Sequence, residues 1–165
     1  MHDKELNISI GSGRWSTSWP TSVMKWSEFC DRLRTPVRGT ETLGEFLTMT
    51  KAEQDHRKDV PGFVGGVIEG ERRKVGNVRS RDLITLDLDN IPSGKTDEVL
   101  STVQMLGCSS AVYSTRKHRQ QAPRLRVIIP TDRTMTIEEY EPICRREAKL
   151  IGIDYCDPTD RKSTT

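Results

Sequence analysis

Aromatic residues are scarce in this chain, and its cysteines stand far apart. Phe, Trp and Tyr together make up 5% of the 165 residues, which argues against a broad aromatic platform that stacks single-stranded bases. None of the four cysteines (Cys30, Cys108, Cys144 and Cys156) belongs to a C-x-x-C pair. A zinc knuckle or a disulfide framework therefore has no support. Scattered single cysteines are typical of proteins in a reducing cytosol.

Long apolar runs are missing as well. No stretch approaches the roughly 20 apolar residues that cross a bilayer, and the charged N-terminus lacks the apolar segment of a signal peptide. We therefore expect a soluble, cytoplasmic protein without a membrane partner. Charged residues make up 30% of the chain and hydrophobic residues 33%, with a net charge of +2. Because that net charge is small, any nucleic-acid site must be argued from where the charges lie.

The order of apolar patterns predicts one α/β (α+β) domain over residues 1–165, with two lobes. The N-terminal αβ lobe (1–80) is expected to contain a strand at 7–10, a helix from 22 to about 33, a helix from 40 to about 56 and a strand at 63–68. The second lobe (81–165) is expected to contain strands at 83–89, 109–114 and 125–129, and helices at 96–106 and 137–150. Its order of strand, helix, strand, strand and helix is that of an RRM-like, largely antiparallel sheet with flanking helices.

Two aspartates, Asp87 and Asp89, stand near the end of the clearest predicted strand. Alternate side chains of a strand share a face, so both carboxylates are expected on one side and Leu86 and Leu88 on the core side. Two adjacent carboxylates repel each other unless a cation lies between them. Mg²⁺ or Mn²⁺ suits such oxygen ligands. The alternative is that one aspartate caps the next helix while the other ends the strand in solvent.

A basic segment runs from Arg116 to Arg126, up to and into the predicted strand at 125–129. Arg124 and Arg126 alternate with apolar residues and are expected to share a face of the strand at 125–129. If that face aligns with the two aspartates, the surface suits a metal–triphosphate complex, with Arg124, Arg126, and Arg116 or His118 on the phosphate oxygens. The alternative is a solvent-exposed face on which these charges form salt bridges.

Weaker signals lie on both sides of these motifs. The segment 152–160 offers a third carboxylate from Asp154, Asp157 or Asp160, although Asp157-Pro158 also fits a simple turn. Glycines 65 and 66 fit either a close backbone approach to a template or nucleotide, or a tight strand bend.

The basic stretch from residue 72 to 81 is a candidate DNA-binding segment. Arg72, Arg73, Lys74 and Arg79 are expected to follow the backbone of a template strand, in which case binding should weaken steeply with salt.

Taken together, these segments resemble the archaeo-eukaryotic primase superfamily, in particular the primase-polymerase modules of phages, plasmids and virulence-associated E-type mobile-element proteins. The resemblance covers nearly the whole chain. It rests on the region of Trp15, Trp19 and Trp26, the helix start at 40–42, and the segments 58–66, 86–89, 113–118 and 123–126.

The resemblance implies template-directed nucleotidyl transfer in mobile-element replication. Its implied partners are a DNA template and primer, nucleoside triphosphates and a helicase domain or protein, and its implied cofactor is Mg²⁺ or Mn²⁺. Asp87 and Asp89 match the first metal-binding motif, and Asp157 is the first choice for the third acid, with Asp154 second.

The chain departs from the family pattern in two places. The second motif is usually Ser-x-His, but here Ser114 is followed by Arg116, and the histidine is His118. Either residue is a candidate phosphate ligand. The chain also ends at Thr165, before an Arg-bearing strand of the family, so we expect an excised or truncated piece.

Two rival functions remain at this stage. A haloacid dehalogenase-like phosphatase would use Asp87 as nucleophile, but that family needs Thr or Val where this chain has Ile91. The other rival is a non-catalytic, RRM-like module that binds nucleic acid or nucleotide. RRM proteins stack bases on aromatic residues of the sheet, whereas the face predicted here carries Asp and Arg.

Overall fold

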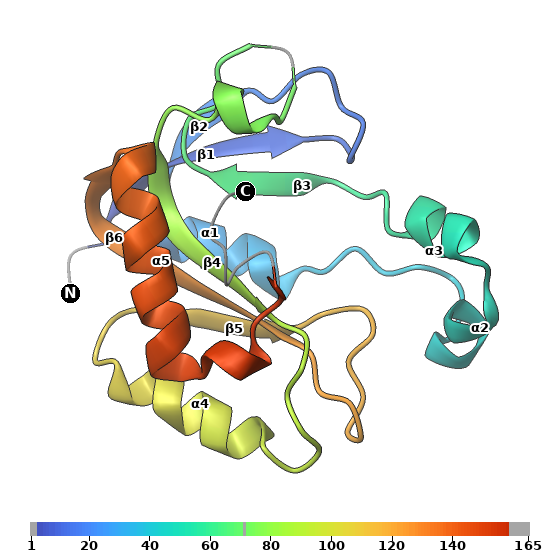
Figure 1. Cartoon of the computed structure of the whole chain (residues 1–165). Helices are drawn as coiled ribbons and strands as arrows, with labels where there is room; N and C mark the ends of the chain where they lie inside the picture. The colour runs from blue at the N-terminus through green and yellow to red at the C-terminus, as the bar shows by residue number, and fades with distance from the viewer. Residues whose placement is uncertain (1–2, 71, 159–165) are drawn as a thin grey trace.

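The strands of the protein form two three-stranded antiparallel sheets (Figure 1). The structure is a computed structural model that describes residues 3–70 and 72–158, so Asp160 lies outside the described residues. The first sheet has the order β2-β1-β3, with β1 at Glu5–Gly11, β2 at Thr21–Lys25 and β3 at Gly62–Gly65. The second has the order β4-β6-β5, with β4 at Arg81–Leu88, β5 at Ala111–Ser114 and β6 at Leu125–Met135. The predicted α+β class is confirmed.

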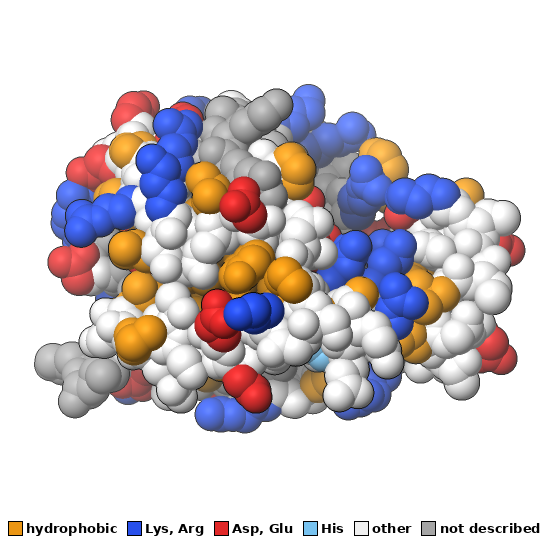
Figure 2. Space-filling model, turned by 60° about the horizontal axis from the view of Figure 1, so that its bottom comes forward, with side chains coloured by type: hydrophobic (Ala, Val, Ile, Leu, Met, Phe, Trp, Pro, Cys, Tyr) orange, Lys and Arg blue, Asp and Glu red, His pale blue; other side chains and the backbone are white. Residues whose placement is uncertain are grey.

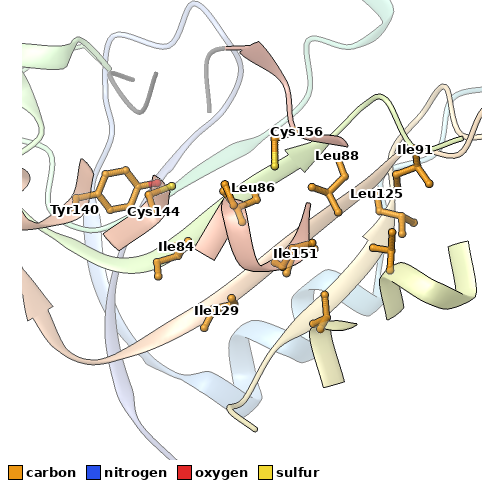
Figure 3. Packing of buried hydrophobic residues seen from close by; sticks show 14 of the residues in the cluster. Ile84, Leu86, Leu88, Ile91, Leu125, Ile129, Tyr140, Cys144, Ile151 and Cys156 are labelled. Carbon is orange, nitrogen blue, oxygen red and sulfur yellow. The ribbon is translucent and has the colours of Figure 1, made fainter. Parts of the chain in front are cut away.

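Two helices, α4 (Thr96–Met105) and α5 (Ile137–Ile151), cover one face of the second sheet (Figure 1). Most apolar side chains of β4 and β6, among them Leu86 and Ile129, point into this layer and meet those of the helices (Figure 3). Helix α5 begins with the predicted capping box, in which Thr136 and Glu139 satisfy each other's backbone N–H groups. The predicted order of strand, helix, strand, strand and helix is therefore present.

The chain returns to β4 after α5 through the short 3-10 helix η2 (Ile153–Tyr155). The Asp157 N–H donates to the Asp87 carbonyl oxygen at 2.8 Å, and the Asn90 N–H donates to the Tyr155 carbonyl oxygen at 3.1 Å. The segment at 155–157 therefore lies along the free edge of β4, beside the two aspartates.

The other face of the second sheet is covered at one end by the first sheet and by α1 (Trp26–Arg34). Leu83 and Ile128 of the second sheet are buried there, against Leu6, Ile8, Met24 and Phe29. The part of this face that carries Asp87 and Arg126 remains about one-third exposed. The packing of the two sheets thus leaves a partly open polar surface at one end.

Two helix predictions in the N-terminal lobe were wrong. Residues 21–25 form β2 rather than the start of a helix, because they pair with β1. The helix expected at 40–56 is instead two short helices, α2 (Leu43–Thr48) and α3 (Lys51–Arg57), which protrude from the body of the molecule (Figure 1). Thr42 and Thr50 each form a capping box, and extended backbone at Met49 separates the helices.

The glycine pair Gly65-Gly66 serves the protein's own packing. Gly66 has φ of +151°, and a Cβ there would lie 1.9 Å from the Ser80 carbonyl oxygen. A Cβ on Gly65 would lie 2.4 Å from the Leu83 Cβ. Ser80 and Leu83, around the start of β4, therefore approach these two glycines closely. Residues 75–77 of the following loop form the 3-10 helix η1 (Val75–Asn77).

Within the described part of the chain, no helix combines the length and the apolar composition that crossing a membrane requires.

Candidate functional site

Two carboxylate–guanidinium pairs lie side by side, one between β4 and β6 and one just beyond the ends of these strands. Asp87 lies opposite Arg126 in the strand register, and Arg126 donates from Nε to Oδ1 at 2.5 Å and from Nη2 to Oδ2 at 2.8 Å. Two residues away, Arg124 donates from Nη1 to Asp89 Oδ2 at 2.7 Å. The predicted geometry, with both aspartates and both arginines on one face, is confirmed. The catalytic and binding roles of these residues stay predictions.

Arg126 is the central member of a row that crosses all three strands of this sheet. Its other neighbour is Tyr113 of β5, whose phenol oxygen lies 3.4 Å from Arg126 Nη1. Burial alone would lower the pKa of Arg126, but the hydrogen bonds and the charge of Asp87 raise it. The guanidinium is therefore held charged at the centre of the polar face.

A cleft of about 1200 Å³ opens beside this row. Its lining includes Tyr113, Ser114 and Arg126 on the sheet side, and parts of the segments 28–46 and 58–63 opposite. The Lys and Arg residues in the lining are Arg32, Arg34, Arg38, Lys58, Arg73, Arg116 and Arg126. Figure 2 shows basic side chains gathered between the body of the molecule and the protruding part, which Figure 1 identifies as α2 and α3.

The basic character of the cleft is only partly neutralised by its own acids. The acids of the lining, Glu28, Asp31 and Glu41, pair with Arg32, Arg34 and Arg116 respectively. Arg38, Lys58 and Arg73 have no salt-bridge partner among residues 3–70 and 72–158. These three residues leave the cleft with uncompensated positive charge.

The pKa shifts of two of these cations report the same crowding. Desolvation lowers the pKa of Lys58, and the charge of Lys117 lowers it further. Desolvation also lowers the pKa of Arg73, with the charges of Arg81 and Arg126 acting in the same direction. An anion with several charges would relieve this repulsion, so polyphosphate is a suitable ligand.

Arg116 has its charge engaged within the protein. It forms an ion pair with Glu41, whose side chain is only 6% exposed, and its guanidinium lies 4.5 Å from the Phe46 ring centroid. These contacts attach α2 and the segment before it to the end of β5. Arg116 therefore shapes one wall of the cleft, and its predicted role as a phosphate ligand would require it to leave Glu41.

His118 is turned toward the backbone of β6. Its Nδ1 lies 3.1 Å from the backbone nitrogen of Arg124 and 3.2 Å from the Arg124 carbonyl oxygen, which holds the ring beside the residue before β6. His118 is not among the residues that line the cleft, whereas Ser114 is, and Ser114 is exposed. Of the second-motif residues, Ser114 and Arg116 thus line the cleft, whereas His118 does not.

The two candidates for the third acid differ in position. Asp157 lies beside Asp87, because its N–H donates to the Asp87 carbonyl oxygen at 2.8 Å. Asp154 lies in η2 and is exposed. The position of its backbone favours Asp157, and its role as a ligand stays a prediction.

The donors near Asp87 match a hard divalent cation in kind. Among the described residues, no group of three or more His, Cys, Asp or Glu side chains is placed to hold a metal ion. However, Mg²⁺ is usually bound by one or two carboxylates, waters and substrate phosphates rather than by a cage of protein ligands. Asp87 and Asp89 supply such a pair, so the residues fit this metal with a phosphate substrate.

The predicted DNA-binding stretch divides into residues with different surroundings. Arg79 pairs with Glu69 across its own loop at 2.5 Å. Arg73 faces the cleft and lies 5.7 Å from the Trp19 ring centroid. Arg72 and Lys74 are exposed. Whether this stretch contacts DNA stays a prediction.

Sequence reasoning missed several residues of the cleft. Glu41 and Lys58 belonged to segments noted for their resemblance, but neither was assigned to the site. Phe46, which lies within the helix expected from 40 to about 56, was not assigned to the site either. A signal was present in the repeated T-x-x-E pattern, which marks the starts of α2 and α3. This pattern could have shown that the segment forms two short helices rather than one long helix.

The fold and the site together define an α+β protein with paired carboxylates and guanidiniums on the open face of an antiparallel sheet, beside a basic cleft. The chain belongs to the family of VapE N-terminal domains, whose family model matches residues 1–164. This membership ties it to the virulence-associated E-type proteins. Comparisons with curated proteins and with solved structures gave no match.

Proposed function

We propose that this chain is a metal-dependent nucleotidyltransferase, a primase-polymerase module that joins nucleotides on a DNA template during replication of a mobile element. The observation that carries the proposal is the pairing of Asp87 with Arg126 on adjoining strands and of Asp89 with Arg124 just beyond the ends of these strands. The VapE family membership and the resemblance to the archaeo-eukaryotic primase superfamily support it.

The lining of the cleft contains groups that suit both the base and the phosphates of a nucleoside triphosphate. Phe29, Leu33, Val37 and Leu43 provide apolar lining that suits a base. Lys58, Arg73 and Arg126 provide cations for the phosphates. Ser114, the last residue of β5, supplies a hydroxyl to the lining from the sheet side.

Asp87 and Asp89, with Asp157 as the third acid, are the residues that would hold Mg²⁺ or Mn²⁺. When bound, such ions lower the pKa of an attacking 3′-hydroxyl and stabilise the leaving pyrophosphate. The guanidiniums of Arg124 and Arg126 would then be free to move from carboxylate to phosphate oxygens. The hydrogen bond from the Asp157 N–H to the Asp87 carbonyl oxygen would keep β4 and the returning chain together while these side chains exchange partners.

The direct test is primer synthesis and primer extension by the full chain on single-stranded DNA, with Mg²⁺ or Mn²⁺ and either NTPs or dNTPs. The double variant Asp87→Asn/Asp89→Asn keeps the size of both side chains and removes both charges. Activity should fall on the order of 1,000-fold, because metal stabilisation of the transition state contributes several kcal/mol.

A matched control changes two exposed aspartates elsewhere, Asp97→Asn and Asp132→Asn. This control should retain activity, and circular dichroism should show that both double variants are folded. Undiminished activity in Asp87→Asn/Asp89→Asn would refute the assignment.

A second candidate function is a non-catalytic module that binds nucleotide or nucleic acid. The specific observation in its favour is that arginines already donate to both carboxylate oxygens of Asp87 and to one of Asp89. Equilibrium binding of a non-hydrolysable nucleoside triphosphate separates the two functions. Affinity that rises with Mg²⁺ and needs both aspartates favours the transferase, whereas affinity that ignores Mg²⁺ favours the module.

A further inference from the structure

The loop between β1 and β2 presents a tryptophan to solvent. Trp15 is 76% exposed, while Trp19 in the same loop is 5% exposed. A large aromatic side chain left in water gives up the free energy of burial that an apolar residue normally provides. This contrast within one short loop indicates that Trp15 serves something other than the core.

The loop is anchored on both sides of Trp15. The Arg14 N–H donates to Asp59 Oδ1 at 2.5 Å. On the other side, the Trp19 indole N–H donates to the Ser16 carbonyl oxygen at 3.1 Å. The Trp19 ring packs on Gly11, where a Cβ would come within 2.5 Å of it. The exposed ring is therefore carried by a fixed backbone, which lowers the entropic cost of binding to it.

Positive charge surrounds the exposed ring. The Arg14 guanidinium lies 5.2 Å from the Trp15 ring centroid. Arg73 lies over Trp19, and its lowered pKa reflects desolvation first and then the charges of Arg81, Arg126 and Arg14. Basic side chains therefore form a row from Arg126 in the cleft, through Arg73, to Arg14 beside Trp15.

The hollow beside Trp15 is polar. It has a volume of about 460 Å³ and is lined by Ser12, Gly13, Trp15, Ser16, Thr17, Ser18 and Asp59. Hydroxyl groups next to one aromatic ring offer little to an apolar protein surface. They suit a ligand that combines a flat apolar face with hydrogen-bonding edges, and the attraction for negative charge comes from Arg14 beside the ring.

We propose that this loop binds single-stranded nucleic acid. An unpaired base stacks on Trp15, on the ring face opposite Arg14, and the flanking phosphates contact Arg14 and Arg73. A paired base in a duplex does not offer its face to a side chain, so the site is specific for single strands. The binding of single-stranded nucleic acid does not depend on the proposed function. Only the further statement that this nucleic acid is the template of the transferase rests on it.

The test is the affinity of the full chain for a fluorescent oligothymidylate of about 15 nucleotides, measured by anisotropy without nucleotide or divalent metal. Trp15→Ala should weaken binding by about 5- to 100-fold, and Trp15→Phe should retain most of the affinity because a ring remains. Arg14→Gln should reduce the salt dependence by about one phosphate contact. Met105→Ala, at a similarly exposed side chain on α4, is the matched control and should bind like the wild type.

Two further measurements distinguish stacking from other causes. The oligonucleotide should quench tryptophan emission in the wild type and much less in Trp15→Phe, which keeps Trp19 and Trp26. A duplex of the same length should bind equally to wild type and Trp15→Ala. Full affinity in Trp15→Ala, equal losses in the Ala and Phe variants, or an equal loss for the duplex would each overturn the proposal. Because the assay contains no metal or nucleotide, failure of the transferase assay would leave this result intact.

Discussion

Asp87 and Arg126 are cross-strand neighbours joined by two hydrogen bonds of 2.5 and 2.8 Å. Such a two-point contact fixes orientation as well as charge, because the planar guanidinium matches the two carboxylate oxygens. The pair therefore holds the polar face in a defined geometry before any ligand arrives, and it also contributes to the stability of the sheet.

Removing the charge of Asp87 should destabilise the fold. Asp87→Asn leaves Arg126 without its carboxylate, and we expect a loss of about 1 kcal/mol in the free energy of unfolding. Removing one partner of a fully buried pair costs about 3–5 kcal/mol, but this pair is about one-third exposed. Urea denaturation of Asp87→Asn, Arg126→Gln and the double variant measures the coupling. Additive single effects would show that the pair does not contribute.

The ion pair between Glu41 and Arg116 should hold α2 to the body of the protein. Glu41→Gln leaves the Arg116 charge without its partner, and because the Glu41 side chain is only 6% exposed we expect a loss of about 2 kcal/mol. Hydrogen exchange should become faster in α2 before it does in the second sheet. Glu141→Gln, which removes an exposed pair with Arg145, should cost about 0.3 kcal/mol. Equal effects of the two variants would contradict this assignment.

A methyl group at Gly66 should disrupt the junction of β3 and β4. Its Cβ would lie 1.9 Å from the Ser80 carbonyl oxygen, and φ is +151°. We expect Gly66→Ala to destabilise the protein by about 3 kcal/mol or more, since backbone atoms must move. At Gly76 nothing lies within 4 Å of the built Cβ and no positive φ occurs, so Gly76→Ala should be within about 1 kcal/mol of the wild type. Thermal unfolding compares the two.

Stability should depend on pH through Glu139. The hydrogen bond from Arg133, aided by the Thr136 N–H, lowers the pKa of Glu139 from 4.5 to about 2. Because the folded pKa is below the unfolded one, the stabilisation is complete above about pH 4.5 and is lost as pH falls through about 2. Arg133→Gln should therefore be less stable than wild type near neutral pH, with a difference that shrinks over this window. Urea denaturation at several pH values checks this. Lys149→Gln on the same helix should show no such trend.

The second lobe was predictable because its pattern is local. The alternation around Asp87 and Arg126 sets which side chains share a face of each strand, and period-two geometry does not depend on distant contacts. The first lobe was less predictable. Val23 and Trp26 have helical spacing, yet residues 21–25 pair with β1, and Val23 is 61% exposed. Pairing with a distant strand overrode the local spacing.

The same difference between local and long-range contacts decided which parts of the candidate site were predictable. The alignment of two aspartates with two arginines follows from the strand pattern, and the structure bears it out. The cleft does not follow from any local pattern, because it forms only when the segment 28–46 folds across the end of β5. The engagement of Arg116 by Glu41 depends on the same long-range contact. Sequence spacing alone could not distinguish a free phosphate ligand from a structural ion pair.

The paired charges on β4 and β6 also imply that two ligands would depend on each other. A lone cation must compete with the guanidinium of Arg126 for Asp87, and a lone polyanion must compete with that carboxylate for Arg126. When cation and polyanion bind together, Asp87 pairs with the cation and Arg126 with the polyanion, so neither side chain is left as an unpaired charge. Such a surface would discriminate against stray metal ions and free phosphate alike, and it would respond cooperatively to the complex of the two.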